Sequence, residues 1–138
     1  MPRSSAISNA HIVFADPAPF TRRVIADLFR DSRCGKVDFF ENGATLIEAC
    51  SVSMPDIVII DDNLPFISGI ELLRALSNLP NFEDNPPDIF LLTDETTKSV
   101  VQEAVAGGFK AVIKKPFVPN YLLQVVRECF PLHVQPTS

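Results

Sequence analysis

Two hydrophobic periods run through the chain. Short unbroken apolar runs, such as residues 57–60, are typical of strands buried on both faces of a parallel sheet. Longer segments repeat apolar residues every three or four positions, which is the period of an amphipathic helix. The pattern predicts five strands, at 11–15, 36–41, 56–61, 88–92 and 111–113, and five helices, at about 19–31, around 46–50, and at 70–79, 97–106 and 118–130.

Strands and helices alternate with no long structureless connection between them. Such alternation indicates right-handed crossovers and a doubly wound α/β fold with a parallel sheet. The apolar stripe of each helix is expected to face that sheet. In the first and fourth helices the expected buried residues are Phe20, Val24, Ile25, Leu28, Phe29, Val101, Ala104 and Val105.

The length of 138 residues favours one domain, expected at 10–130, with flexible tails at 1–9 and 131–138. A net charge of −5 argues against a nucleic-acid-binding surface. The sequence has no apolar run long enough for a membrane span and no signal-peptide pattern, so a cytoplasmic protein is expected. Cys34, Cys50 and Cys129 show no CxxC spacing and are expected to be reduced thiols, the latter two on apolar helix faces.

Polar side chains follow four of the predicted strands. Asp16, Asp61, Thr93 and Lys115 each stand at or just beyond a strand end, and the carboxyl ends of parallel strands meet at one edge of the sheet. Two neighbouring carboxylates repel each other, and Mg²⁺ relieves that repulsion. A metal-held carboxylate can act as a nucleophile toward phosphorus, while an ammonium and a hydroxyl stabilise the transferred group.

These residues carry a resemblance to a known family. Asp16, the segment 55–65 with Gly69, Thr93 and the segment 115–117 occur in the order found in receiver domains of two-component response regulators. The chain resembles such a domain over about residues 10–130. The resemblance implies a flavodoxin-like fold with five parallel strands in the order 2-1-3-4-5 and helices on both faces.

The resemblance also implies roles. Asp61 is similar to the phosphoacceptor that takes a phosphoryl group from a histidine kinase or a phosphotransfer protein. Asp16, Asp61 and the backbone carbonyl of Asn63 resemble Mg²⁺ ligands, Thr93 the switch hydroxyl, and Lys115 the phosphate-binding lysine. The bond between Lys115 and Pro116 is expected to be cis.

Three positions depart from the family pattern. Ala15 stands where a second acid is usual, Asp94 follows the switch threonine where a small residue is usual, and Val112 replaces an aromatic residue. These departures keep open a pseudo-receiver, an interaction domain that is not regulated by phosphorylation. Asp62 is expected to point to the opposite face from Asp61 and to be solvated.

The leading prediction is a non-enzymatic signalling domain, a monomer or weak dimer, that contacts a downstream protein through about residues 96–130. A phosphorelay shuttle is a variant of the same chemistry. A Mg²⁺-dependent phosphatase is disfavoured because Asn63 cannot act as the general acid. A flavin site is disfavoured because Pro17 and Pro19 remove backbone donors from the first loop. His11 and His133 are expected to be structural or solvent-facing, and Lys114 to be exposed.

Overall fold

The computed structural model describes residues 9–33 and 35–129, the last of them by its backbone alone. Strands and helices alternate strictly from β1 to α5. Their bounds are β1 His11–Ala15, α1 Pro19–Asp31, β2 Lys36–Phe40, α2 Gly43–Val52, β3 Ile57–Asp61, α3 Gly69–Ser77, β4 Asp88–Thr93, α4 Lys98–Gly107, β5 Ala111–Lys114 and α5 Pro119–Cys129.

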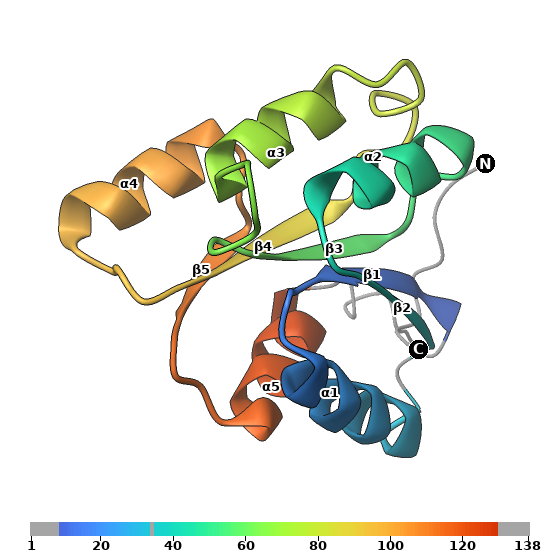
Figure 1. Cartoon of the computed structure of the whole chain (residues 1–138), viewed down its shortest axis with the longest axis vertical. Coiled ribbons are helices and arrows are strands. Elements are labelled where there is room, and N and C mark those ends of the chain that lie inside the picture. The colour runs from blue at the N-terminus through green and yellow to red at the C-terminus, as the bar shows by residue number, and fades with distance from the viewer. Residues whose placement is uncertain (1–8, 34, 130–138) are drawn as a thin grey trace, which may run out of the picture.

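The five strands form one parallel sheet in the order β2-β1-β3-β4-β5. Helices α2, α3 and α4 cover one face of this sheet, and α1 and α5 cover the other (Figure 1). The α/β class, the strand order and the helices on both faces are therefore confirmed.

Two apolar cores lie on the two faces of the sheet, because side chains alternate along each strand. In β3, Ile57 and Ile59 belong to the core under α1 and α5. Val58 and Ile60 belong to the core under α2, α3 and α4. All five residues of β3 are buried, as expected for the central strand of a sheet covered twice.

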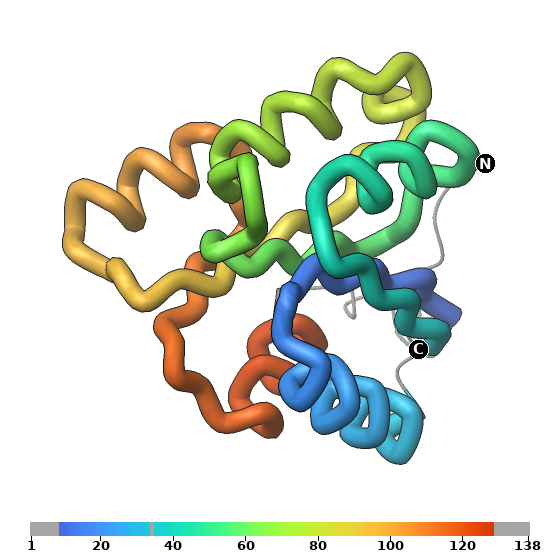
Figure 2. Tube along the Cα trace, viewed as in Figure 1, coloured from blue at the N-terminus to red at the C-terminus, as the bar shows by residue number. Residues whose placement is uncertain are grey.

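The ends of the helices follow local sequence signals. Pro19 opens α1, where its missing N–H is not needed. The Asn42 side chain accepts a hydrogen bond from the Thr45 N–H at the start of α2, at 2.9 Å. Ser68 and Glu71 form a reciprocal capping box at the start of α3. The chain path through these turns can be followed in the tube of Figure 2.

Two helix stripes differ from the prediction. Phe20 is 78% exposed and Val105 is 50% exposed, although both were expected to be buried. Phe20 lies in the first turn of α1, and Val105 lies on α4, which packs toward the edge strand β5.

The remaining structural expectations have mixed outcomes. Cys50 is a buried free thiol, and Lys114 is exposed, both as predicted. His11 has a structural role, since its Nε2 lies 2.8 Å from Asp38 Oδ2. Cys34, His133 and the Cys129 side chain lie outside the described part of the structure, as do residues 1–8 and 131–138 of the expected tails and residue 130 of the expected last helix. No described helix is long and apolar enough to cross a bilayer.

Candidate functional site at the carboxyl edge of the sheet

Three polar residues are buried in the described structure, and all three belong to the predicted site. Asp16 follows β1, Asp61 ends β3 and Thr93 ends β4, with exposed fractions of 2%, 5% and 2%. The parallel strands deliver them to the same edge of the sheet. Buried ionisable groups require partners, so their contacts indicate what the site can do.

Lys115 supplies the main partner of Asp61. Its Nζ lies 2.9 Å from Asp61 Oδ1 and 3.1 Å from Asp61 Oδ2. The peptide bond between Lys115 and Pro116 is cis, as the resemblance implied. The Asn63 N–H also donates to Asp61 Oδ1, at 2.8 Å. Asp61 is therefore held by an ammonium and a backbone amide, with fewer donors at Oδ2 than at Oδ1.

Asp16 has a different environment. Its Oδ1 accepts a hydrogen bond from the Ala18 N–H at 2.7 Å, in the turn before α1. Burial raises the pKa of Asp16 above its ordinary value, and the negative charge of Asp61 raises this pKa further. The Ala18 hydrogen bond, Lys115 and Arg22 act in the opposite direction. The site thus holds two mutually repelling carboxylates with the ammonium bound to one of them.

This donor set fits Mg²⁺. Within the described residues, no group of three or more His, Cys, Asp or Glu side chains is arranged to hold a metal ion. Mg²⁺ does not require such a group, because it binds one or two carboxylates and completes its octahedron with carbonyl oxygen and water. A divalent cation beside Asp16 and Asp61 also removes the repulsion that raises the Asp16 pKa.

Thr93 is engaged with Asp62 rather than with Asp61. Its hydroxyl donates to Asp62 Oδ2 at 3.4 Å and accepts from the Glu95 N–H at 3.1 Å. Asp62 Oδ1 accepts from the Gly69 N–H at 2.8 Å. Asp62 does point to the opposite face from Asp61, but the expectation that it is merely solvated is wrong.

The three unusual positions also have defined surroundings. Ala15 is fully buried in the core under α2, α3 and α4, so an apolar residue occupies the place of the second acid. Val112 packs against the same core. Asp94 is exposed and lies at the wall of a neighbouring cavity.

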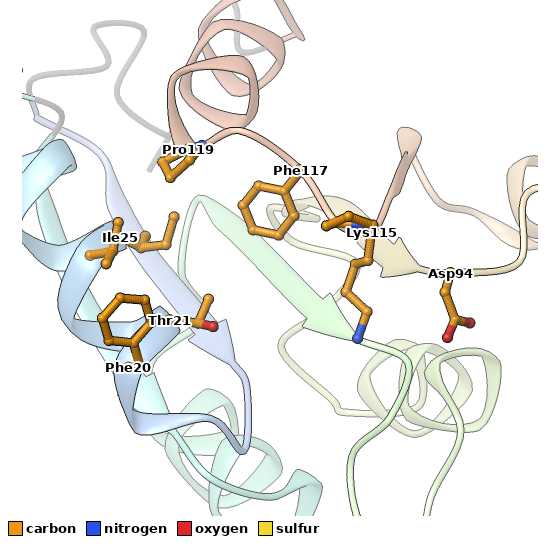
Figure 3. Close-up of a pocket in the computed structure, with 9 residues that line it drawn as sticks. Phe20, Thr21, Ile25, Asp94, Lys115, Phe117 and Pro119 are labelled. Atoms are coloured by element: carbon orange, nitrogen blue, oxygen red, sulfur yellow. The ribbon is translucent and has the colours of Figure 1, made fainter.

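That cavity has a volume of about 510 Å³ and lies between α1 and the connection from β5 to α5. Its walls are mainly apolar, and they include Phe20, Ile25 and Phe117 (Figure 3). The Lys115 side chain lies at its edge and extends toward the end of β3 (Figure 3). The exposed Phe20 therefore forms part of a concave surface beside the predicted site.

Comparisons with known proteins agree with this geometry. The family model of the response regulator receiver domain matches residues 12–127. The chemotaxis protein CheY of Bacillus subtilis is 28% identical over 117 residues, which is 85% of this chain and 94% of the relative. A protein-glutamate methylesterase/protein-glutamine glutaminase of Desulfotalea psychrophila is 25% identical, but the match covers 36% of its length and 88% of this chain.

Solved structures show the same fold. The chemotaxis response regulator CheY4 of Vibrio cholerae superposes with a TM-score of 0.78 at 24% identity, over 87% of this chain and 98% of that one. At this identity the likeness supports the fold alone.

Proposed function

Because the chain belongs to the response regulator receiver domain family, we propose that it accepts a phosphoryl group on Asp61. The observation that carries this proposal is the contact of the Lys115 ammonium with both oxygens of the buried Asp61 carboxylate. A cation in this place neutralises charge on a phosphoryl group as it is transferred. The donor is a histidine kinase or a phosphotransfer protein of a two-component or phosphorelay system.

The transfer exchanges one bond to phosphorus for another. Asp61 Oδ2 attacks the phosphorus atom, the bond from phosphorus to the donor nitrogen breaks, and its electron pair returns to the donor's imidazole. Oδ2 is the attacking atom in this proposal because Oδ1 is engaged by both the Asn63 N–H and Lys115. Lys115 keeps its charge throughout and follows the oxygens of the transferred group.

Asp16 and Asp61, with the backbone carbonyl of Asn63, would hold Mg²⁺. When bound, the ion neutralises negative charge shared between the carboxylates and the phosphoryl oxygens. The repulsion between Asp16 and Asp61 supports this assignment, as does the lack of an ion pair at Asp16 among the described residues, where Lys115 pairs with Asp61 instead. The Asn63 carbonyl as a ligand stays a prediction from the family resemblance.

Thr93 is the proposed reporter of the phosphorylated state. Its hydroxyl lies at the end of β4, next to the strand that ends in Asp61. A phosphoryl group on Asp61 offers this hydroxyl a strong charged acceptor. Movement of Thr93 would shift the following loop and α4, and so change the surface that a partner reads.

The output surface is proposed at about residues 96–130, where a downstream protein would bind. Val105, Val118 and Tyr121 are large apolar side chains in this segment, and each is at least half exposed. Exposed apolar residues gathered on one segment are a feature of protein-binding surfaces. A monomer or weak dimer in the cytoplasm, with no nucleic-acid or membrane partner, fits this reading.

A pseudo-receiver is the second candidate, and Ala15 and Asp94 favour it. Ala15 removes a carboxylate from the metal site, and Asp94 places a negative charge beside the cavity next to Lys115. In that case the domain binds its partner with the same affinity in every phosphorylation state.

Incubation with acetyl phosphate and Mg²⁺ separates the two candidates. The receiver proposal requires that intact-mass spectrometry detect one added phosphoryl group, which is absent in Asp61→Asn. The exposed carboxylate Asp84 provides a matched control, since Asp84→Asn is expected to be modified like the wild type. No added mass on any variant, or equal mass on Asp61→Asn, overturns the proposal.

A further inference from the structure

The Asp62 side chain connects α3 with the end of β4. One of its oxygens accepts from the Gly69 N–H at 2.8 Å, and the other accepts from the Thr93 hydroxyl at 3.4 Å. Gly69 is the first residue of α3, and Thr93 is the last residue of β4. A single carboxylate therefore links the proposed switch residue to the start of a helix.

The alternation of side chains explains this contact. Leu91 of β4 faces the core under α2, α3 and α4, and Thr93, two residues later, faces the same side. Ile60 of β3 also faces that side, so Asp62 follows on it, whereas Asp61 belongs to the other side. Thr93 and Asp62 meet across neighbouring strands for this reason.

The hydroxyl of Thr93 has a single hydrogen to donate. In the structure this hydrogen is directed to Asp62, while the hydroxyl oxygen accepts from the Glu95 N–H. A hydrogen bond from Thr93 to a phosphoryl oxygen on Asp61 therefore requires that the bond to Asp62 break. The two acceptors compete for the same hydrogen.

We propose that Asp62 is a positioning residue that holds the Thr93 hydroxyl in its resting place and couples its release to the N-terminus of α3. The proposal rests on the proposed phosphorylation of Asp61. When Thr93 leaves, the Asp62 carboxylate retains its bond to the Gly69 N–H, where the positive end of the helix stabilises its charge. The state of the site then reaches α3 as well as α4.

The distance from the Thr93 hydroxyl to Asp62 Oδ2 is long, at 3.4 Å, and this favours transfer of the hydrogen bond to a phosphoryl oxygen. A hydrogen bond of this length is weak, so a phosphoryl oxygen that accepts at a shorter distance displaces it. A stronger bond to Asp62 would lock Thr93, and no bond would leave it unrestrained. The proposal therefore predicts a modest effect of Asp62 rather than an all-or-none one.

The first test uses the unphosphorylated protein and is independent of the proposed function. Three-bond couplings to the Thr93 methyl carbon report its χ1 rotamer by NMR. The rotamer seen in the structure is expected to be more populated in the wild type than in Asp62→Ala, where only the Glu95 N–H still holds the hydroxyl. Equal rotamer populations in the two proteins overturn the proposal.

The second test uses beryllofluoride with Mg²⁺ as a phosphoryl mimic. Asp62→Asn is the main variant, because the Asn oxygen still accepts from the Gly69 N–H while its amide cannot accept from Thr93. The beryllofluoride midpoint is expected to fall about two-fold, the lower end of the range for one hydrogen bond, because the bond from Thr93 to Asp62 is long. An unchanged or raised midpoint contradicts the proposal.

A double-mutant cycle separates the hydrogen bond from the loss of charge. In a Thr93→Val background the effect of Asp62→Asn is expected to disappear, whereas a purely electrostatic effect persists. The Gly69 amide resonance is expected to shift with beryllofluoride in the wild type and to stay in place in Thr93→Val. Persistence of the two-fold effect in Thr93→Val, or a Gly69 shift in Thr93→Val that equals the wild-type shift, overturns the coupling.

The failures are distinguishable. A wild type that binds no beryllofluoride contradicts the proposed function, while the rotamer measurement still decides whether Asp62 holds Thr93.

Discussion

Lys115 contacts both carboxylate oxygens of Asp61, although the two residues are 54 positions apart in the sequence. The contact crosses from the end of β3 to the segment after β5 and places a cation against a buried acid. It is the central electrostatic relationship of the site.

Replacement of Lys115 by Met keeps a long side chain and removes the charge. The rate of phosphoryl gain from acetyl phosphate is expected to fall about 100-fold, the usual cost of one lost charge-stabilising donor. Time-resolved intact-mass spectrometry measures this rate. The exposed neighbour Lys114 provides the control, because Lys114→Met is expected to keep the wild-type rate. Equal losses in both variants would assign the effect to overall charge instead.

Mg²⁺ is expected to stabilise the fold through Asp16. The pKa of Asp16 is raised by burial and by the charge of Asp61, so its contribution to stability is present below its ordinary pKa of 3.8 and is lost as the pH rises through the raised value. Above the raised pKa the charge of Asp16 therefore opposes folding, and a bound cation offsets this. Mg²⁺ at ten times its Kd is expected to add about 1.4 kcal/mol to the free energy of unfolding.

Thermal melts with and without Mg²⁺ measure this shift. Asp16→Ala is expected to lose most of the Mg²⁺ effect, whereas Asp84→Asn keeps it, because Asp84 is an exposed acid in the loop before β4. The same Mg²⁺ shift in Asp16→Ala would show that the ion acts elsewhere.

The surroundings of Gly69 leave no room for a side chain. A Cβ atom at Gly69 would lie 2.5 Å from Leu91 Cδ1 and 3.0 Å from Asp62 Oδ1. Gly69→Ala is expected to destabilise the fold by about 1–3 kcal/mol, as overpacking of a well-filled core does. Urea unfolding measures the change.

Gly107 is the matched control for Gly69, because its nearest contact to a built Cβ is 3.5 Å, at Ile70 Cδ1. Gly107→Ala is expected to be neutral or stabilising, since alanine is the better helix former. Similar losses in the two variants would contradict the steric explanation.

The capping box of α3 predicts a pH dependence. Hydrogen bonds from the Ser68 backbone and side chain lower the pKa of Glu71 below its ordinary value of 4.5. A lowered pKa contributes stability above the ordinary value, and this stability is lost as the pH falls through the lowered one. The difference in urea midpoint between the wild type and Glu71→Ala is therefore expected to be larger at neutral pH than at pH about 3. A difference that grows on acidification would contradict this assignment.

Cys50 is expected to resist alkylation in the native protein. It lies on the buried face of α2, and burial raises the pKa of its thiol to about 11, so little thiolate exists near neutral pH. In a variant with Ser at positions 34 and 129, iodoacetamide at mildly alkaline pH is expected to label Cys50 only after urea is added. Rapid labelling without urea would show that the site opens locally.

Much of the fold could be predicted because the signals are local and strong. The apolar run of residues 57–60 requires cover on both faces, and this fixes β3 as the central strand. Asp16, Thr93 and Lys115 could be placed near Asp61 because parallel strands share one carboxyl edge. The exact donors to Asp61, such as the Asn63 N–H, depend on loop geometry and carry no separate sequence signal.

The errors arise at the margins of the sheet. Phe20 and Val105 follow the helical period, yet both side chains are exposed, and Phe20 lines the cavity beside the site. Asp62 was placed on the correct face, yet its partners depend on how the loop to α3 returns beside β4. The sequence holds two signals for the start of α3 beside β4. Ser68 is a strong helix cap, and Gly69 follows it.

The strand order also determines which part of the chain completes the site. β1 pairs with β3 as well as β2, and the segments that carry Asp16 and Asp61 both lie within the first 61 residues. Lys115 follows β5, which pairs with β4 at the edge of the sheet and is the last strand along the chain. A nascent or truncated chain that lacks β5 therefore carries the two acids without the ammonium that neutralises them. The proposed phosphoryl transfer to Asp61 is therefore expected to require the complete sheet, including β5.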